Sequence, residues 1–489
     1  MNFATAIKNE SRKKYTENGA QALNSTGEAC LDMFGSIGAL RKRNTVDVER
    51  IYAEAYKDDA LLATKILFYA RDIRQGCGER KTFRTLLHYA AKIHPESIRP
   101  NIALIGEYGR YDDLYELIDT PLEDDMWAFM SEQLTKDVEN CNNNKPVSLL
   151  AKWVKTADAS SDATRKLGIK TAIKCGYQVR DFKRIIRKLR KYIDIVEAKM
   201  SANNWDQINY ETVPSRAMHI YKPAFRRHDE DRFKGYIESV AKGEAKINAG
   251  TLYPYDIVSE VLYKHPDATA LDVLNAQWDN LPNYVEEGTN AMVIADVSGS
   301  MSGQPMASSI GLALYFAERN TGAYQNLFMT FSDRSDIIRV EGETLQQKIQ
   351  FIHQADWGGS TNLEAAFDKV LQIAIDNHVA PEEMIKSLIV VSDMEINNMT
   401  RGTSQSWTFY DSMRERYREA GYEIPNVVFW NVDARNDTFH ADSERKGVQL
   451  CSGSSATTFK HLADCIGMTP IEMMLRVINS ERYAPITVE

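Results

Sequence analysis

The first 288 residues carry apolar side chains mainly at helical spacing. In segments 61–69, 83–89 and 126–138, apolar residues return every three or four positions. Glycine and proline residues, among them Gly76 and Pro95, separate these segments. Successive short helices divided by turns predict an all-α solenoid of stacked helix pairs.

From residue 289 onward the pattern changes, because short apolar runs alternate with amphipathic segments. Strands are predicted at 291–295, 326–331, 388–393, 426–431 and 447–451, and helices at 305–319, 344–353, 363–375, 406–420, 456–464 and 470–477. Short all-apolar runs are typical of parallel strands that are buried on both faces. The alternation predicts an α/β domain with a doubly wound sheet.

Length supports a multidomain protein, since 489 residues exceed what one hydrophobic core usually holds. We expect a helical domain at 1–288 and an α/β domain at 289–489, joined by a linker at 275–290 that contains Pro282 and Gly288. A content of 43% hydrophobic and 26% charged residues is typical of a folded globular protein.

Oxygen-bearing side chains lie where several predicted strands end or helices begin. Asp296, Ser298 and Ser300 follow the strand 291–295 at alternate positions, Thr361 precedes the helix 363–375, and Asp393 closes the strand 388–393. Ligands of open α/β sheets bind outside the carboxyl ends of the strands. Oxygen donors suit Mg²⁺ or Mn²⁺ better than Zn²⁺. The alternative is that these residues only cap helices and turns.

In this order the five residues resemble the metal-ion-dependent adhesion site of the von Willebrand factor A family, written DxSxS, then T, then D. The resemblance implies that all five coordinate a metal ion directly or through water. It also implies an open coordination position that accepts a carboxylate from a protein partner. This sequence departs from the family after Asp393, where Met394 and Glu395 replace the usual glycine and its successor. Glu395 is expected to crowd the site or to add a charge.

The net charge of −9 is unevenly distributed, since the first half of the chain is net basic and the second half is net acidic. One cluster consists of Lys183, Arg184, Arg187, Lys188, Arg190 and Lys191. Helical spacing places most of these cations on one broad face, which favours binding of a polyanion. Arg226 and Arg227 form a second basic pair. The alternative is an ordinary solvated helix face.

Short motifs in the helical half resemble the TROVE module of Ro ribonucleoproteins. They are RDIRQGCGER at 71–80 and GRYDDL at 109–114, and the segments 215–218 and 225–229 fit a branch with the same two modules. Ro-type proteins join a ring of HEAT-like helices to a von Willebrand A domain. The resemblance implies binding of small structured or misfolded RNA, chiefly through the RNA backbone. The helical part is shorter than a full Ro ring, so ring closure stays open.

Motifs for catalysis are missing, since the sequence has neither a Walker A loop nor HExxH or GxSxG spacing. We therefore expect no enzyme. Six cysteines without a CxxC pair, no signal peptide and no membrane span indicate a cytoplasmic protein, which we expect to be a monomer. Two function classes follow: a Ro-type RNA-binding protein with a Mg²⁺ site for a partner, or a metal-dependent protein-interaction scaffold without RNA.

Overall fold

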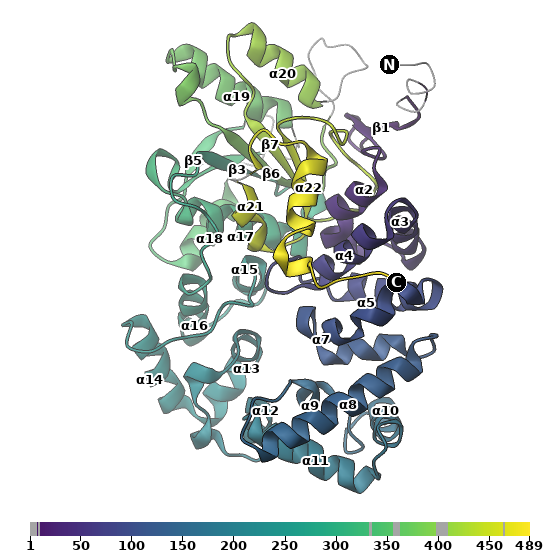
Figure 1. The fold of residues 1–489 in the computed structure, drawn as a ribbon. Coiled ribbons are helices and arrows are strands. Elements are labelled where there is room, and N and C mark those ends of the chain that lie inside the picture. Colours follow the sequence, from purple (N-terminus) through teal and green to yellow (C-terminus); the bar gives the residue numbers. More distant parts are fainter. Residues whose placement is uncertain (1–6, 8–9, 332–334, 356–361, 398–408, 463–464) are drawn as a thin grey trace.

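The computed structural model describes residues 7, 10–331, 335–355, 362–397, 409–462 and 465–489. Helices of the first 279 residues form an arc, and both ends of this arc contact the α/β part of the chain, which contains a six-stranded sheet (Figure 1). The predicted combination of a helical part and an α/β part is thus confirmed. Within the described residues, no helix is both long enough and apolar enough to span a bilayer.

The arc consists of α2 (Ala29–Ser36), α3 (Thr45–Asp58), α4 (Ala60–Arg71), α5 (Lys81–Ile93), α6 (Pro95–Ile98), α7 (Ile105–Tyr108), α8 (Glu123–Asn142), α9 (Leu150–Trp153), α10 (Asp162–Lys174), α11 (Val179–Tyr192), α12 (Val196–Ser201), α13 (Ser215–His228), α14 (Glu230–Ala241), α15 (Pro254–Tyr263) and α16 (Ala268–Asp279). Their apolar stripes face their neighbours. In α5, for example, Phe83, Leu86, Leu87 and Ala90 are buried at helical spacing. Side-chain caps start several helices, as where Asp59 accepts from the Leu62 amide at 2.8 Å.

The sheet has the strand order β5-β4-β3-β6-β7-β8. Its strands are β3 (Ala291–Ala295), β4 (Leu327–Thr330), β5 (Ile337–Arg339), β6 (Ser387–Ser392), β7 (Asn426–Asn431) and β8 (Val448–Ser452). All neighbours are parallel except β4 and β5. The five predicted strands are therefore present. The edge strand β5 was not predicted, because its three residues are only partly buried or exposed and give no apolar run.

Helices cover both faces of the sheet. They are α17 (Gln304–Arg319), α18 (Leu345–Gln354), α19 (Leu363–Asp376), α20 (Phe409–Glu419), α21 (Phe459–Leu462) and α22 (Pro470–Ile478). Side chains of β3 alternate between two cores, with Met292 and Ile294 in one and Val293 in the other. The predicted helices thus exist, although residues 406–408 and 463–464 of two of them lie outside the described residues.

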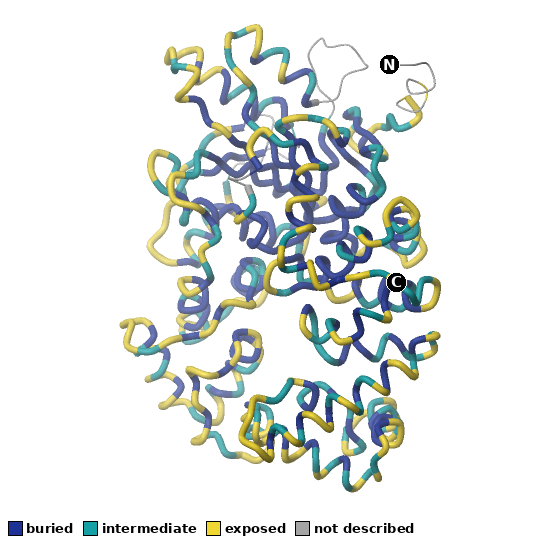
Figure 2. Tube along the Cα trace, in the orientation of Figure 1, coloured by how far each residue is buried: buried dark blue, intermediate teal, exposed yellow. Residues whose placement is uncertain are grey.

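The amino-terminal segment belongs to the core of the sheet. A hairpin of β1 (Lys13–Tyr15) and β2 (Gln21–Leu23), not expected from the sequence, bridges to the α/β part, where Leu23 pairs with Phe439. Helix α2 then packs against β8, and its buried side chains share one core with those of the sheet. Figure 2 shows this burial as a continuous dark region across both parts. The division at residue 288 therefore separates sequence segments but does not separate cores.

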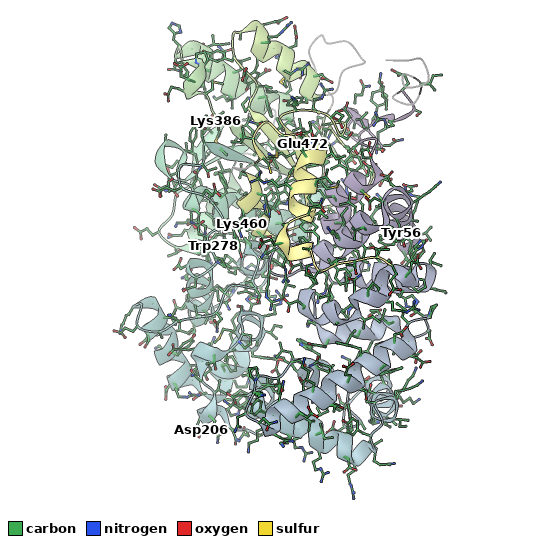
Figure 3. All side chains as sticks on the ribbon, viewed as in Figure 1. Tyr56, Asp206, Trp278, Lys386, Lys460 and Glu472 are labelled. Atoms are coloured by element: carbon green, nitrogen blue, oxygen red, sulfur yellow. The ribbon has the colours of Figure 1, made fainter. Side chains whose placement is uncertain are left out.

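The other end of the arc also meets the sheet's helices. Helix α15 packs along α17, and Trp278 of α16, labelled in Figure 3, donates its indole N–H to Glu318 of α17 at 2.6 Å. Arg319 lies over the Trp278 ring at 5.6 Å. The expected linker at 275–290 is partly wrong, because α16 continues to Asp279 and only the following residues connect to β3.

Candidate functional site

Three buried aspartates lie at the carboxyl edge of the sheet. Asp296 follows β3, Asp393 follows β6, and Asp433 comes two residues after β7. Their exposed fractions are 0%, 2% and 1%. Strands β3 and β6 are neighbours, and the strand order runs in opposite directions on their two sides. This is the switch point of the sheet, where α/β folds bind ligands.

The DxSxS segment turns its oxygen atoms toward one another. The Asp296 carboxylate accepts from the Ser298 amide at 2.9 Å, and the hydroxyl oxygens of Ser298 and Ser300 are 3.0 Å apart. The second Asp296 oxygen accepts from the Ser392 hydroxyl at 2.7 Å. The structure thus brings together three of the five predicted ligands, with Asp393 on the neighbouring strand. Thr361 lies outside the described residues.

Two of the three aspartates have a basic partner. Asp393 accepts from Arg435 at 2.6 Å, and Asp433 accepts from Lys42 at 2.7 Å. In the part of the chain that the structure describes, no basic side chain pairs with Asp296. Burial, together with the nearby charge of Asp393, raises the pKa of the Asp296 carboxyl to about 6. An uncompensated buried carboxylate of this kind fits a cation as its partner.

The donor set agrees with a hard divalent ion. The described residues hold no cluster of three His, Cys, Asp or Glu side chains, so hydroxyls must complete any coordination shell around Asp296 and Asp393. Carboxylate and hydroxyl oxygens are suited to Mg²⁺ or Mn²⁺, which also retain water ligands. When bound, such an ion would offer an open position to an oxygen of a ligand. Asp296, Ser298, Ser300 and Asp393 are the residues that would hold it.

The expectation that Glu395 crowds this site is wrong. Its carboxylate accepts from the Glu17 amide at 2.6 Å and from the side chains of Asn436 and Thr438, each at 3.1 Å. Glu395 therefore holds the amino-terminal hairpin to the loop that follows β7. Met394 adopts a left-handed φ of 68°, a backbone conformation that favours glycine.

Asp433, Arg435 and Lys42 were not predicted from the sequence. The pattern Asn-Val-Asp after an all-apolar strand was an available signal for Asp433, because it repeats the logic used for Asp393. Lys42 precedes Asp433 by 391 residues in the chain. Only the packing of the amino-terminal segment against the sheet brings these two together.

The predicted basic cluster lies on α11. Phe182, Ile186 and Leu189 are buried, and the opposite side of the helix exposes cations. We call the exposed cations Arg184, Arg187, Lys188 and Lys191 the basic face. It lies on the part of the arc farthest from the sheet (Figure 1). Arg187 and Lys191 form no ion pair within the described residues, whereas Arg184 lies 3.3 Å from Asp181.

Arg190 does not belong to this face. Its guanidinium donates to the carbonyl oxygens of Ala151 at 2.8 Å and Val154 at 3.1 Å, which end α9. Its role is therefore to satisfy a helix terminus. Lys183 is half-buried and lies 3.8 Å from Asp158. In the second basic pair, Arg226 pairs with Asp267 and Arg227 is exposed.

The motifs at 71–80 and 109–114 are joined by ion pairs within the arc. Arg71 donates to the buried Asp113 at 2.7 Å, and Arg84 donates to the same carboxylate at 2.5 Å. The Asp112 carboxylate accepts a hydrogen bond from Arg80 at 3.0 Å. The ionic pairing between these motifs therefore has a structural role, although Arg110 also stacks over the Trp153 ring at 4.5 Å.

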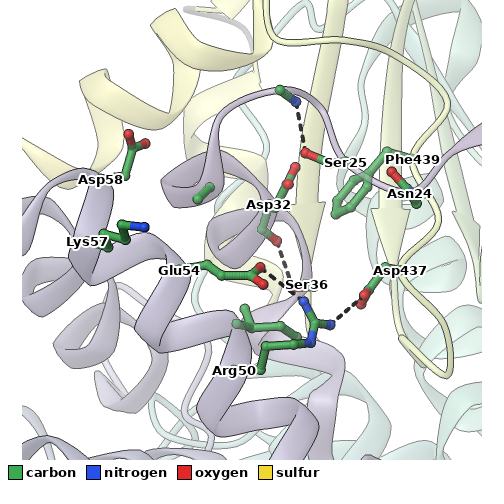
Figure 4. A pocket seen from close by; sticks show the side chains of 13 residues that line it. Asn24, Ser25, Asp32, Ser36, Arg50, Glu54, Lys57, Asp58, Asp437 and Phe439 are labelled. Carbon is green, nitrogen blue, oxygen red and sulfur yellow. Dashed lines mark hydrogen bonds and ion pairs between the residues drawn. The ribbon is translucent and has the colours of Figure 1, made fainter. Parts of the chain in front are cut away.

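A separate cavity of about 550 Å³ lies between α2, α3 and the loop at 437–439 (Figure 4). An ion pair between Arg50 and Asp437, 2.7 Å long, crosses it. Burial raises the pKa of Asp32, which lines this cavity, to about 6. The cavity adjoins the loop that carries Arg435 but does not include the sheet-edge aspartates.

Two family models match the chain. The model described as domain of unknown function (DUF2828) matches residues 16–128 and 121–289, and the model described as domain of unknown function (DUF7788) matches residues 290–476. The DUF2828 match covers more than half of the chain.

Known proteins with similarity include one from Acanthamoeba polyphaga mimivirus, "Uncharacterized protein L728". It is 30% identical over 516 residues, which cover 96% of this chain and 88% of that protein. Among solved structures, the Ro (RSR) protein of Deinococcus radiodurans matches with 14% identity and a TM-score of 0.49, covering 89% of this chain and 99% of that one. The extent of the model match and of the mimiviral similarity shows that this chain belongs to the DUF2828 family.

Proposed function

We propose that this protein is a Ro-type RNA-binding protein whose α/β part carries a divalent-metal site for a protein partner. In this proposal the helical arc binds small structured or misfolded RNA, and the protein acts by binding rather than by catalysis. The observation that carries the RNA part is the basic face of α11. Its four cations point away from the core of the arc, and Arg187 and Lys191 have no ionic partner among the described residues.

The basic face suits a phosphate backbone better than it suits individual bases. Four exposed cations along about two helical turns can each reach a phosphate, and phosphate contacts position a protein on a nucleic acid without reading its bases. RNA helices are recognised mostly through backbone and shape. Neutralised phosphates release counterions, so affinity should fall steeply with salt. We therefore propose RNA contacts by Arg184, Arg187, Lys188 and Lys191, with Arg227 as a contact on α13.

The metal part of the proposal rests on Asp296, a buried carboxylate that has no basic partner in the described chain. A Mg²⁺ or Mn²⁺ ion held by Asp296, Ser298 and Ser300, with Asp393 nearby, would offset this charge. Its open position would take a carboxylate from the partner, as the resemblance to the von Willebrand A adhesion site implies.

The test of RNA binding starts from the purified full-length protein. Its absorbance ratio at 260 and 280 nm should fall after ribonuclease treatment and repurification. A variant with Arg184, Arg187 and Lys191 all changed to Glu should bind much less structured RNA in a filter assay at low salt. The matched control changes Lys386, Arg414 and Lys446 to Glu, which are exposed cations of the α/β part.

The control has the same total charge change as the α11 variant, so it isolates position from net charge. Equal RNA binding by the two variants would remove α11 as the binding surface. If the wild-type protein carries no ribonuclease-sensitive material and binds no RNA, the second candidate applies. That candidate is a metal-dependent protein-interaction scaffold, and the buried Asp296 is the observation that favours it.

A further inference from the structure

Arg435 places a positive charge directly on the proposed metal site. One guanidinium nitrogen donates to an Asp393 oxygen at 2.6 Å, and the other terminal nitrogen lies 3.3 Å from the Glu17 carboxylate. The second Asp393 oxygen accepts from the Glu395 amide at 3.1 Å. Both oxygens of this carboxylate are thus engaged, one of them by a full cation.

The amino-terminal part of the chain holds Arg435 in this position. Arg43 donates to the Arg435 carbonyl oxygen at 3.1 Å and pairs with Asp437 at 3.1 Å. Lys14 donates to the Asp437 carbonyl oxygen at 3.0 Å. The backbone of the Arg435 loop is therefore fixed from the hairpin and the arc, while its side chain reaches the sheet edge.

We propose that Arg435 is an internal counter-ion that competes with the divalent cation for Asp393, and so keeps the metal affinity of the site low. This inference rests on the metal site proposed above. A divalent ion close to Asp296 and Asp393 would meet the Arg435 charge at short range, and the two cations repel each other. Metal binding would be strongest when the guanidinium leaves Asp393.

The same contacts assign a regulatory role to the amino-terminal hairpin. Glu17 draws the guanidinium toward the hairpin, and the Glu17 amide is itself bound by Glu395. A partner that moves this hairpin would change the position of Arg435. It would thereby change the affinity of the metal site without touching the ligands of the ion.

The test measures Mn²⁺ binding to the full-length protein by electron paramagnetic resonance of the free ion. Arg435→Gln should tighten binding by about tenfold or more, because it removes a unit charge within a few ångströms of the ion. Arg435→Lys keeps the charge and should stay near the wild-type affinity. Lys42→Gln removes the neighbouring cation from Asp433 and should have a smaller effect than Arg435→Gln. Circular dichroism verifies that each variant is folded.

The possible outcomes separate the two proposals. Binding that is unchanged or weaker in Arg435→Gln, with wild-type binding abolished by Asp296→Ala, overturns the competition and leaves the metal site standing. If neither the wild-type protein nor Arg435→Gln binds Mn²⁺, both proposals fail. If only Arg435→Gln binds Mn²⁺, the guanidinium blocks the site completely, which supports the competition in its strongest form.

Discussion

Asp72 and Arg482 lie 410 residues apart in the chain and form a two-pronged ion pair, with nitrogen–oxygen distances of 2.8 and 3.0 Å. Asp72 is fully buried in the arc, and Tyr483 donates to the same carboxylate at 3.2 Å. Arg482 also lies over the Tyr108 ring at 4.4 Å. The carboxyl-terminal segment is thereby joined to the carboxyl end of α4.

Arg482→Met should destabilise the protein strongly. Removing one partner of a buried pair leaves an uncompensated charge, which costs about 3–5 kcal/mol. The free energy of unfolding, measured by urea denaturation, should fall by this order. The control is Arg74→Met, which removes an exposed ion pair to Glu107 nearby and should cost less than about 1 kcal/mol. Equal losses in the two variants would contradict a special role for the Asp72 pair.

The sequence predicted the sheet well because its strands are buried on both faces. Strands β3 and β7 have the predicted limits. A short apolar run next to a turn is typical of a buried strand. Their ends then placed Asp296 and Asp393 at one edge, since parallel strands that are adjacent end together.

Tertiary contacts account for what the sequence could not predict. Arg190 shares its helix and its charge with Arg187, but the free carbonyl groups at the end of α9 lie beside Arg190 only in the folded arc. The same holds for Arg435, whose position depends on the amino-terminal hairpin. Helical spacing describes one element and contains no information about what packs against it.

Gly38→Ala tests whether the amino-terminal segment belongs to the sheet core. A Cβ atom at Gly38 would lie 2.5 Å from the Ser452 carbonyl oxygen of β8. Backbone atoms cannot yield easily, so the loss of stability should be about 1–3 kcal/mol. Gly235→Ala in α14 is the matched control, because open space surrounds it and alanine favours helix by about 1 kcal/mol. The midpoint of urea denaturation should fall for Gly38→Ala and rise for Gly235→Ala.

Asp32 should make stability depend on pH. Burial raises its pKa from 3.8 to about 6, so the folded state holds a proton that the unfolded state has lost between these values. Stability therefore falls as pH rises through this window, by up to about 3 kcal/mol, and is level above it. Asp32→Asn should not lose stability in this way. Its free energy of unfolding should therefore rise relative to that of the wild type between pH 4 and pH 6. A constant difference in melting temperature across that range would contradict the assignment.

The metal site predicts a specific response of Asp296→Asn. Wild-type melting temperature should rise with millimolar Mg²⁺ or Mn²⁺ and fall back with EDTA, because an ion that binds only the folded state stabilises it. Asp296→Asn should show no such response, yet melt in EDTA at or above the wild-type temperature, since it removes a buried charge. Asp433→Asn, at the same sheet edge, should keep the metal response. If the wild-type melting temperature does not change with Mg²⁺, Mn²⁺ or EDTA, the oxygens of the predicted metal site only form turns.

Arg187 and Arg190 are three residues apart on α11 and should respond oppositely to truncation. Arg187→Ala removes an exposed cation, so it should weaken RNA binding and lower the slope of affinity against salt by about one unit, without a change in melting temperature. Arg190→Ala leaves the carbonyl groups of Ala151 and Val154 without their donor. It should lower the free energy of unfolding by about 1–3 kcal/mol and affect RNA binding only through stability.

Filter binding at several salt concentrations and urea denaturation of both variants provide the comparison. If Arg190→Ala also lowered the salt slope while keeping full stability, this side chain would contact RNA after all, and the inward position seen in the fold would have to change on binding.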